Sequence, residues 1–253
     1  MAADLESPTT MAGRVAVVTG GGSGLGRATC LMLAGSGATV LVADVNAAGA
    51  AETVRLAAAQ GGDARAVELD VTDSASVDQA LAAAFDEHGQ ALDCLVNNAG
   101  TDQGADLPDV TDEQWHAVFG VNVHGPMHTS RAFLRHVVAL GPRNRPADIV
   151  SVVSISALTV GSGAGAYNSS KAALLKLTEV LQSETRERGW PVRVCAISPS
   201  AMNTPMMEQW HLADEQMMDP AAVAALIRTA VTLPPSMVLQ SLVVTSRNEY
   251  YPR

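Results

Sequence analysis

Residues 14–26 read RVAVVTGGGSGLG, an apolar run that passes directly into a cluster of glycines. A helical pattern follows at once, so the glycines lie between an expected strand and an expected helix. Glycine permits positive φ and lets the backbone approach a phosphate closely. A helix N-terminus adds unpaired N–H groups and the positive end of the helix dipole. Glycine clusters also form ordinary turns, but this position favours a loop that binds the pyrophosphate of a dinucleotide.

Apolar runs and helical patterns alternate along almost the whole chain. Most runs lack polar alternation, which is typical of strands covered on both faces of a parallel sheet. The expected strands are Arg14–Thr19, Thr39–Asp44, Ala64–Leu69, Leu92–Asn97, Asp148–Ser154, Val192–Ile197 and Val238–Val244. The expected helices are Gly24–Gly35, Ala47–Gln60, Ala75–His88, Thr111–Leu140, Ala166–Arg188 and Pro220–Leu233, with Ser74 and Thr111 as expected N-caps. This order predicts an α/β fold: a Rossmann-type, doubly wound parallel sheet of about seven strands with helices on both faces.

Composition limits the class of protein. The 253 residues are 47% hydrophobic, which excludes disorder as the main state. Because 16 Lys and Arg stand against 26 Asp and Glu, a formal net charge of −10, nucleic acid and anionic membrane surfaces are disfavoured as partners. No apolar run reaches the ~18 residues of a membrane span. We expect a single domain over residues 13–253, preceded by a flexible tail at 1–12 that lacks the features of a signal peptide.

The cysteines, Cys30, Cys94 and Cys195, are odd in number and lie far apart in apolar runs. This spacing suits neither a disulfide framework nor a metal site. We therefore expect buried thiols and, by default, a cytoplasmic protein. His124 and His128 have i, i+4 spacing, but no acid is placed as a third ligand, so no metal site is expected.

Asp44 ends the second expected strand, 18 residues after Gly26. An acid at this point of a dinucleotide-binding unit accepts hydrogen bonds from the adenosine ribose and repels a 2′-phosphate. It would otherwise be an ordinary strand-end residue. Neither Ser23 nor the residues after Asp44 supply a cation for a 2′-phosphate, and Arg27 is expected to point elsewhere from within its helix. The sequence therefore favours NAD over NADP.

Tyr167 and Lys171 lie one turn apart on an expected helix, and Lys171 is one of only two lysines in the chain. Residues at i and i+4 share a helix face, and a cation beside a tyrosine stabilises the phenolate and lowers the tyrosine pKa. Such pairs are also common on solvated helices. Ser154, at the end of a strand 13 residues before Tyr167, could bind the same substrate oxygen, which favours a proton-transfer site.

These residues, in this order and spacing, resemble those of the short-chain dehydrogenase/reductases over roughly residues 12–245. Residues 19–26 are similar to the family's T-G-x-x-x-G-x-G cofactor loop, and residues 97–100 to its N-N-A-G segment. The resemblance implies a catalytic tetrad of Asn122, Ser154, Tyr167 and Lys171. It also implies that the cofactor is contacted by Gly20, Ser23, Gly24, Leu25, Gly26, Asp44, Asp70, Val71, Asn98, Ala99, Gly100, Tyr167, Lys171, Pro199 and Thr204.

The activity that the resemblance implies is NAD-dependent oxidation of a secondary alcohol, or reduction of the ketone, with Tyr167 as the acid/base. Ser154 would bind the substrate oxygen. Lys171 would lower the pKa of Tyr167 and hold the nicotinamide ribose, and Asn122 would hold a water that links Lys171 to solvent. Ser200 departs from the family, which usually has glycine there. The ending at 248–253 departs too, so a homodimer through the two long helices is a safer expectation than a homotetramer.

The segment 200–219, called here the lid segment, is rich in methionine. It carries Met202, Met206, Met207, Met217 and Met218 around Trp210. The segment follows a strand at the ligand-binding edge of the expected sheet. That position favours a flexible apolar lid over the substrate, although such residues would also suit the core. An apolar alcohol or ketone is therefore the expected substrate.

Two other functions stay open. A 3-oxoacyl thioester reductase would require NADPH and an acidic carrier, so Asp44 and the net charge argue against it. A local basic patch argues for this reductase, although such a patch also suits a solvated face. The patch comprises Arg131, Arg135, Arg143 and Arg145. A non-catalytic dinucleotide-sensing regulator could use the same fold, but the complete tetrad argues against a sensor.

Overall fold

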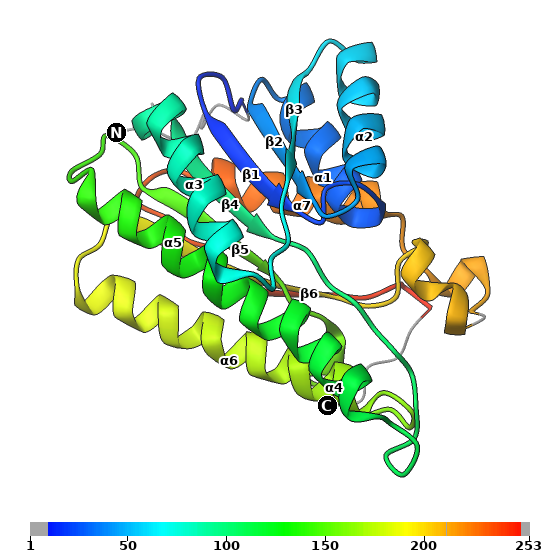
Figure 1. Ribbon diagram of the computed structural model, residues 1–253. Helices are drawn as coiled ribbons and strands as arrows, with labels where there is room; N and C mark the ends of the chain where they lie inside the picture. The colour runs from blue at the N-terminus through cyan, green and yellow to red at the C-terminus, as the bar shows by residue number, and fades with distance from the viewer. Residues whose placement is uncertain (1–9, 211, 249–253) are drawn as a thin grey trace.

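The computed structural model describes residues 10–210 and 212–248. Within these ranges seven strands form one sheet, in the order β3-β2-β1-β4-β5-β6-β7, and every neighbouring pair is parallel (Figure 1). The strands are β1 (Val15–Thr19), β2 (Thr39–Asp44), β3 (Asp63–Glu68), β4 (Leu92–Asn97), β5 (Ala147–Val152), β6 (Val192–Pro199) and β7 (Ser241–Val244). The predicted doubly wound parallel sheet is confirmed.

Helices cover both faces of the sheet. They are α1 (Gly24–Gly35), α2 (Ala47–Ala59), α3 (Ser74–His88), α4 (Asp112–Phe119), α5 (Gly125–Ala139), α6 (Gly165–Glu187) and α7 (Pro220–Thr232). On β1, Ala16 and Val18 join the core cluster that α1 and α7 complete, whereas Val15 and Val17 join the cluster of α3 and α5. Both faces are buried at the centre of the sheet, so β1, β4, β5 and β6 are buried at every position, whereas the edge strands β3 and β7 are partly exposed.

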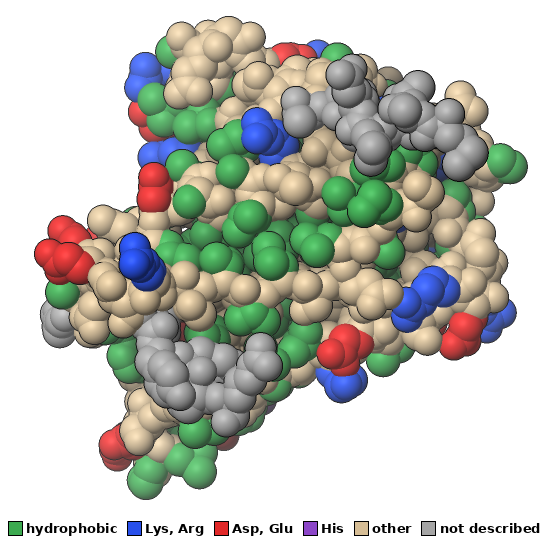
Figure 2. Space-filling model, turned by 180° about the vertical axis from the view of Figure 1, so that it is seen from behind, with side chains coloured by type: hydrophobic (Ala, Val, Ile, Leu, Met, Phe, Trp, Pro, Cys, Tyr) green, Lys and Arg blue, Asp and Glu red, His purple; other side chains and the backbone are tan. Residues whose placement is uncertain are grey.

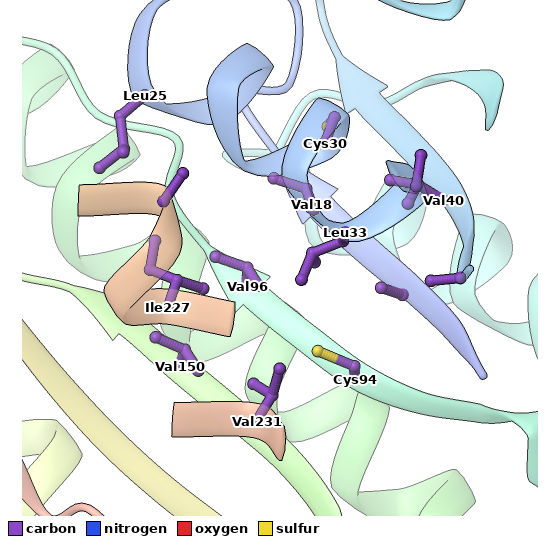
Figure 3. Packing of buried hydrophobic residues seen from close by; sticks show 14 of the residues in the cluster. Val18, Leu25, Cys30, Leu33, Val40, Cys94, Val96, Val150, Ile227 and Val231 are labelled. Carbon is purple, nitrogen blue, oxygen red and sulfur yellow. The ribbon is translucent and has the colours of Figure 1, made fainter. Parts of the chain in front are cut away.

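One core lies between the sheet and the pair α1 and α7. Figure 3 shows Leu33 of α1 and Ile227 of α7 in the same cluster as Val96 of β4 and Val150 of β5. All four are at most 1% exposed. Full burial of such a side chain contributes about 1.5–3 kcal/mol. The three cysteines are buried free thiols, as predicted.

The strand order creates the binding edge. From β1 the chain winds towards β3, and from β4 it winds the opposite way towards β7. The connections therefore diverge at the carboxyl ends of β1 and β4, which leaves a crevice where ligands bind in this kind of fold. The glycine cluster follows β1 and the N-N-A-G segment follows β4, so both motifs lie at this crevice.

The predicted helix Thr111–Leu140 is wrong as a single α-helix. A π-helical turn, Gly120–His124, separates α4 from α5. Pro126 explains part of the break, because it has no N–H to donate to the carbonyl of Asn122 one α-turn earlier. Gly125 brings this turn against Val71, whose Cγ2 would lie 2.8 Å from a Cβ at that position. The predicted N-cap Thr111 is confirmed, in a capping box with Gln114.

Most other element boundaries differ from expectation by one to three residues, including the start of α3 and the start of β7. Asp73, rather than Ser74, caps α3, since its carboxylate accepts a hydrogen bond from the Ala75 N–H at 2.9 Å. Strand β7 begins at Ser241 instead of Val238, because a turn closed by the Met237 N–H and the Pro234 carbonyl precedes it.

The expected tail lies mostly outside the described residues, as do 249–253 at the other end. Its described part packs onto the domain: Met11 is fully buried, and its N–H donates to the Ser36 carbonyl at 2.7 Å. Across the described ranges, none of the helices has the length and apolarity to cross a bilayer.

Apolar side chains also reach the surface. Figure 2 shows them across the middle of the face seen from behind, with most charged side chains towards the margins. At the edge of the sheet, Met237, Val238 and Val243 are 53%, 44% and 43% exposed. Exposed apolar area of this kind is common where proteins contact one another.

Candidate active site

A cavity of about 660 Å³ opens at the carboxyl ends of the strands. It is lined by the loops that follow β1, β4, β5 and β6, by the first turn of α6 and by the lid segment. All the predicted catalytic and cofactor residues line this cavity except Asn122, which lies buried behind it. The fold therefore brings together residues that are spread from Gly20 to Thr204 in the chain.

The glycine loop forms the floor of one end of the cavity. Gly20 and Gly24 have φ of +64° and +49°, and a Cβ on Gly26 would lie 1.9 Å from the Gly20 carbonyl oxygen. Ser23 is the N-cap of α1, but its side chain makes no capping hydrogen bond, and the first turn holds no acid. The first N–H groups of α1 are thus available for an anion, so the loop fits a pyrophosphate.

Asp44 shapes this loop as well as lining the cavity. Its Oδ2 accepts the Gly22 N–H and its Oδ1 accepts the Asn46 N–H, each at 2.8 Å. Arg27 holds the same loop from the other side, donating to the Gly22 carbonyl and, at 3.0 Å, to Thr53 Oγ1. As predicted, Arg27 is not among the residues that line the cavity.

The N-N-A-G segment ties β4 to β1. The N–H groups of Asn98 and Ala99 both donate to Thr19 Oγ1 at 3.0 Å. The Asn98 side chain also donates to the Thr19 carbonyl at 2.9 Å. These bonds hold the two strand ends together at the crevice, so the loops on either side are fixed relative to each other.

The cavity is also lined by Asp70 and Val71, which follow β3. Asp70 Oδ1 accepts two hydrogen bonds from Thr72, at 2.8 Å and 2.7 Å. The Val71 carbonyl lies 3.0 Å from His128 Nδ1. His128 therefore serves the backbone here, and within residues 10–210 and 212–248 no three metal-binding side chains cluster.

Tyr167, Ser154 and Lys171 meet at the centre of the cavity. Ser154 follows β5, caps a short 3₁₀ turn by accepting the Ser156 N–H at 3.1 Å, and is hydrogen-bonded to Tyr167. Lys171 is 3% exposed, and its Nζ donates to the Val152 carbonyl at 3.0 Å. The same Nζ lies 5.6 Å from the centre of the Tyr167 ring.

The protonation of this pair differs from the sequence prediction. Burial of the phenol raises the pKa of Tyr167 to about 12, although the hydrogen bond from Ser154 lowers it. Burial likewise lowers the pKa of Lys171 to about 8. This direction is opposite to the expected lowering of the Tyr167 pKa, because desolvation penalises the phenolate more than its neighbours stabilise it.

Asn122 is fully buried in the π-helical turn. Its Nδ2 donates to the Thr101 carbonyl and to Ser170 Oγ, both at 2.9 Å, and its Oδ1 accepts the Thr101 N–H at 2.9 Å. Ser170 Oγ in turn donates to the Tyr167 carbonyl at 2.7 Å. The side chain thus joins the loop after β4 to the first turn of α6. Both of its N–H groups are occupied, so the expected water would have to bind elsewhere on Asn122.

The lid segment covers the other end of the cavity. Met202, Met206 and Met207 line it, together with Trp210. Met218 instead packs against the core beside Met202, and Met217 does not line the cavity. The lid expectation therefore applies to the first half of the methionine cluster.

Ser200, which replaces the family's usual glycine, is 4% exposed and joins β6 to the chain after β7. Its N–H donates to the Val244 carbonyl at 2.9 Å, and its Oγ accepts the Ser246 N–H at 3.3 Å. The Ser200 hydroxyl therefore accepts a hydrogen bond that a glycine at this position could not accept.

Asp102 is the functional candidate that sequence reasoning missed. It lines the cavity, and its Oδ2 accepts a hydrogen bond from Trp210 Nε1 at 3.0 Å. Burial raises the pKa of Asp102, and its negative charge raises the pKa of both Tyr167 and Lys171. Its position two residues after the N-N-A-G segment, at the binding edge, was the available signal.

The arginine patch is mostly used within the chain. Arg131 donates to Ser74 Oγ at 2.8 Å, Arg143 donates to the Gln90 carbonyl, and Arg145 lies 3.6 Å from Asp93. Arg135 is exposed. Since three of the four arginines have partners in the chain, the patch gives little support to docking of an acidic carrier.

The parallel sheet, the glycine loop and the clustered Ser, Tyr and Lys around the cavity are the features of an α/β oxidoreductase. A family model described as short chain dehydrogenase matches residues 14–215. The chain belongs to the short-chain dehydrogenase/reductase family, and it is therefore an oxidoreductase that acts on hydroxyl or keto groups.

Three curated relatives are similar to most of this chain in sequence. The 1-deoxy-11-beta-hydroxypentalenate dehydrogenase of Streptomyces avermitilis is 38% identical over 193 residues, covering 76% of this chain and 69% of the relative. An NAD-dependent oxidoreductase of Mycobacterium tuberculosis is 36% identical, covering 78% and 74%. The fluoren-9-ol dehydrogenase of a Terrabacter species is 34% identical, covering 87% and 64%.

Two solved structures show the same architecture. A short-chain type dehydrogenase/reductase from Mycobacterium marinum has a TM-score of 0.86 and 25% identity, covering 95% of this chain and 97% of that one. A family member from Burkholderia phymatum, in complex with NAD, has a TM-score of 0.82 and 29% identity, covering 92% and 89%.

Proposed function

We propose that the protein is an NAD-dependent dehydrogenase of secondary alcohols with an apolar body, and a reductase of the corresponding ketones. The observation that carries this proposal is the hydrogen-bonded pair of Ser154 and Tyr167 in a cavity with a glycine loop at one end and methionines at the other. Relatives named for a hydroxypentalenate and for fluoren-9-ol support an alcohol on a ring system.

The side chains suit proton transfer at one oxygen. The substrate oxygen lies between Ser154 Oγ and the Tyr167 hydroxyl, so Ser154 orients it and Tyr167 takes its proton in oxidation or returns it in reduction. Lys171 places a cation beside the phenol, and it would hold the nicotinamide ribose of a bound cofactor. Bound NAD supplies the hydride acceptor, and the glycine loop with the α1 N-terminus would hold its pyrophosphate.

The preference for NAD rests on charge. Asp44 places a carboxylate at the end of β2 beside the glycine loop. Among the described residues that line the cavity, Lys171 is the one Lys or Arg, and its contacts are with Val152 and Tyr167. A 2′-phosphate would therefore meet an acid and no cation.

We also propose a cytoplasmic homo-oligomer. Three buried free thiols suit a reducing compartment. The exposed apolar residues at the β7 edge, and Val138 and Val180 on the helices α5 and α6, suit contacts with further copies of the chain. The helix contact is tested by measuring the size of the protein in solution. If α6 forms the contact, Val180→Glu should give a smaller particle than wild type.

The test is a screen of 1-phenylethanol, 1-indanol and 9-fluorenol with NAD and with NADP, read by absorbance of the reduced cofactor. Oxidation with NAD is expected for at least one of them. Tyr167→Phe keeps the ring and removes the hydroxyl, so it should lose about 10²–10⁴ in rate while keeping its cofactor affinity. Absence of turnover with either cofactor across the series, or full turnover by Tyr167→Phe, would overturn the proposal.

A further inference from the structure

Asp102 gives the substrate end of the cavity a negative charge. The described acids that line the cavity are Asp44, Asp70 and Asp102. Asp44 is held at the glycine loop and Asp70 follows β3, so both lie at the end of the cavity that we propose for the adenosine of NAD. Asp102 instead contacts Trp210 of the lid segment and influences Tyr167 electrostatically. It is thus the acid that a substrate held at Tyr167 would meet.

The carboxylate of Asp102 is held in place. Trp210 Nε1 donates to its Oδ2 at 3.0 Å, and the Trp210 ring packs against the same loop, since a Cβ on Gly104 would lie 3.2 Å from Trp210 Cη2. Asp102 Oδ1 is buried without a hydrogen-bond partner. A carboxylate in this setting is weakly screened by water, so it acts strongly on charges nearby.

Compensating cations are scarce at this end. In the described part of the cavity lining, Lys171 alone is basic, and its Nζ already donates to the Val152 carbonyl. The parts of the cavity lining that come from the lid segment and from the loop after β5 carry no charge, and they include Met206, Met207, Trp210, Leu212, Ser156 and Thr159. A substrate anion at this end would therefore meet the half-buried carboxylate of Asp102, with Lys171 as the one cation in the described lining.

We propose that Asp102 is a specificity residue, which makes the cavity accept neutral or cationic secondary alcohols and reject those with a carboxylate directed towards the lid segment. This inference rests on the proposed function, because it concerns substrates oxidised at Tyr167. Like charges in a desolvated site repel strongly, whereas an ammonium or a hydroxyl donor is attracted to the carboxylate.

The test uses 1-phenylethanols that differ only at the para position: methyl, aminomethyl or carboxylate. Wild type should oxidise the methyl and aminomethyl compounds with a kcat/KM at least about tenfold above that of the carboxylate compound. Asp102→Asn keeps an oxygen that can accept the Trp210 N–H but removes the charge, so this ratio should fall towards one. Asp106→Asn, at an exposed acid of the same loop that does not line the cavity, should keep the wild-type ratio.

Trp210→Phe separates charge from structure. It removes the N–H donor but keeps the carboxylate, so discrimination against the carboxylate substrate should persist. If the Asp102–Trp210 bond had a purely structural role, Trp210→Phe and Asp102→Asn would lose this discrimination to the same extent. The inference would be overturned by an unchanged kcat/KM ratio in folded Asp102→Asn, or by a wild-type preference for the carboxylate compound. In either case, turnover of the methyl compound would still support the proposed function. No turnover of any compound would instead count against the proposed function.

Discussion

Lys171 Nζ lies 5.6 Å from the centre of the Tyr167 ring and donates a hydrogen bond to the Val152 carbonyl at 3.0 Å. Burial disfavours charge on both side chains, with a pKa of about 12 for Tyr167 and about 8 for Lys171. A positive charge placed beside the phenol would favour its ionised form.

The first prediction concerns pH. Oxidation needs Tyr167 without its proton, so kcat for oxidation should rise with pH, and reduction needs the proton, so kcat for reduction should fall. With the oxidised cofactor bound, the apparent pKa should lie below the value of about 12 for the free protein. Lys171→Ala should move it upward and weaken NAD binding. Measurement of kcat against pH in both directions checks this, and an oxidation rate that falls with pH would contradict it.

The second prediction concerns cofactor choice. NAD should bind at least about tenfold more tightly than NADP, about 1.4 kcal/mol. Asp44→Asn removes the charge but keeps one oxygen for the Gly22 N–H, and Val45→Arg adds a cation at a residue that is 70% exposed and lines the cavity. The double variant should shift affinity towards NADP in a fluorescence titration. If Val45→Arg alone gave the same shift, Asp44 would be a strand-end residue without a role in discrimination.

The third prediction concerns alkaline stability. Burial raises the pKa of the Cys195 thiol to about 12 from its ordinary 9.0. Between these values the unfolded chain holds fewer protons than the folded one, so the free energy of unfolding falls as pH rises. Lys171, with its lowered pKa, acts in the opposite direction up to its ordinary 10.5. Cys195→Ala should make the slope above pH 9 less steep by about 1.4 kcal/mol per pH unit, measured by urea unfolding; an unchanged slope would contradict the assignment.

Much of the fold follows from local sequence patterns. The central strands are covered on both faces, so they stand out as apolar runs, and the glycines after β1 mark the helix start and the binding edge. The linked motifs then place residues as distant as Gly20 and Thr204 on one cavity. Each such motif is a short segment whose chemistry depends on neighbours in the chain, which is why it can be recognised without coordinates.

Long-range contacts between unrelated segments could not be predicted in this way. Asp102 and Trp210 are 108 residues apart, and no local pattern connects them. The pKa of Tyr167 depends on how deeply the phenol is buried, and that is a property of the packed lid, loops and helix together. Arg14 looks like the ordinary start of a strand, yet it lies in a buried charge network with residues 79 and 134 positions away.

That network joins the amino ends of four strands. Arg14 is 1% exposed; its Nε donates to Asp93 and its Nη2 to Asp148, each at 2.7 Å. Arg193 donates to the other oxygen of Asp148 at 2.8 Å. Arg14 also donates from its Nη1 to the Val231 carbonyl, at the end of α7, at 2.6 Å. The charges are therefore paired and hydrogen-bonded, which buried charges require.

The last prediction is that Arg14→Met costs about 3–5 kcal/mol of unfolding free energy, because it leaves Asp93 buried without its main cation. The double variant Arg14→Met with Asp93→Leu should recover part of this loss, since paired apolar replacements are often near neutral. Glu52→Gln, in an exposed pair with Arg55, should leave the urea midpoint nearly unchanged. Because the network lies at the strand ends away from the cavity, kcat/KM of folded Arg14→Met should match wild type. A loss below about 1 kcal/mol would show that the network contributes little to stability.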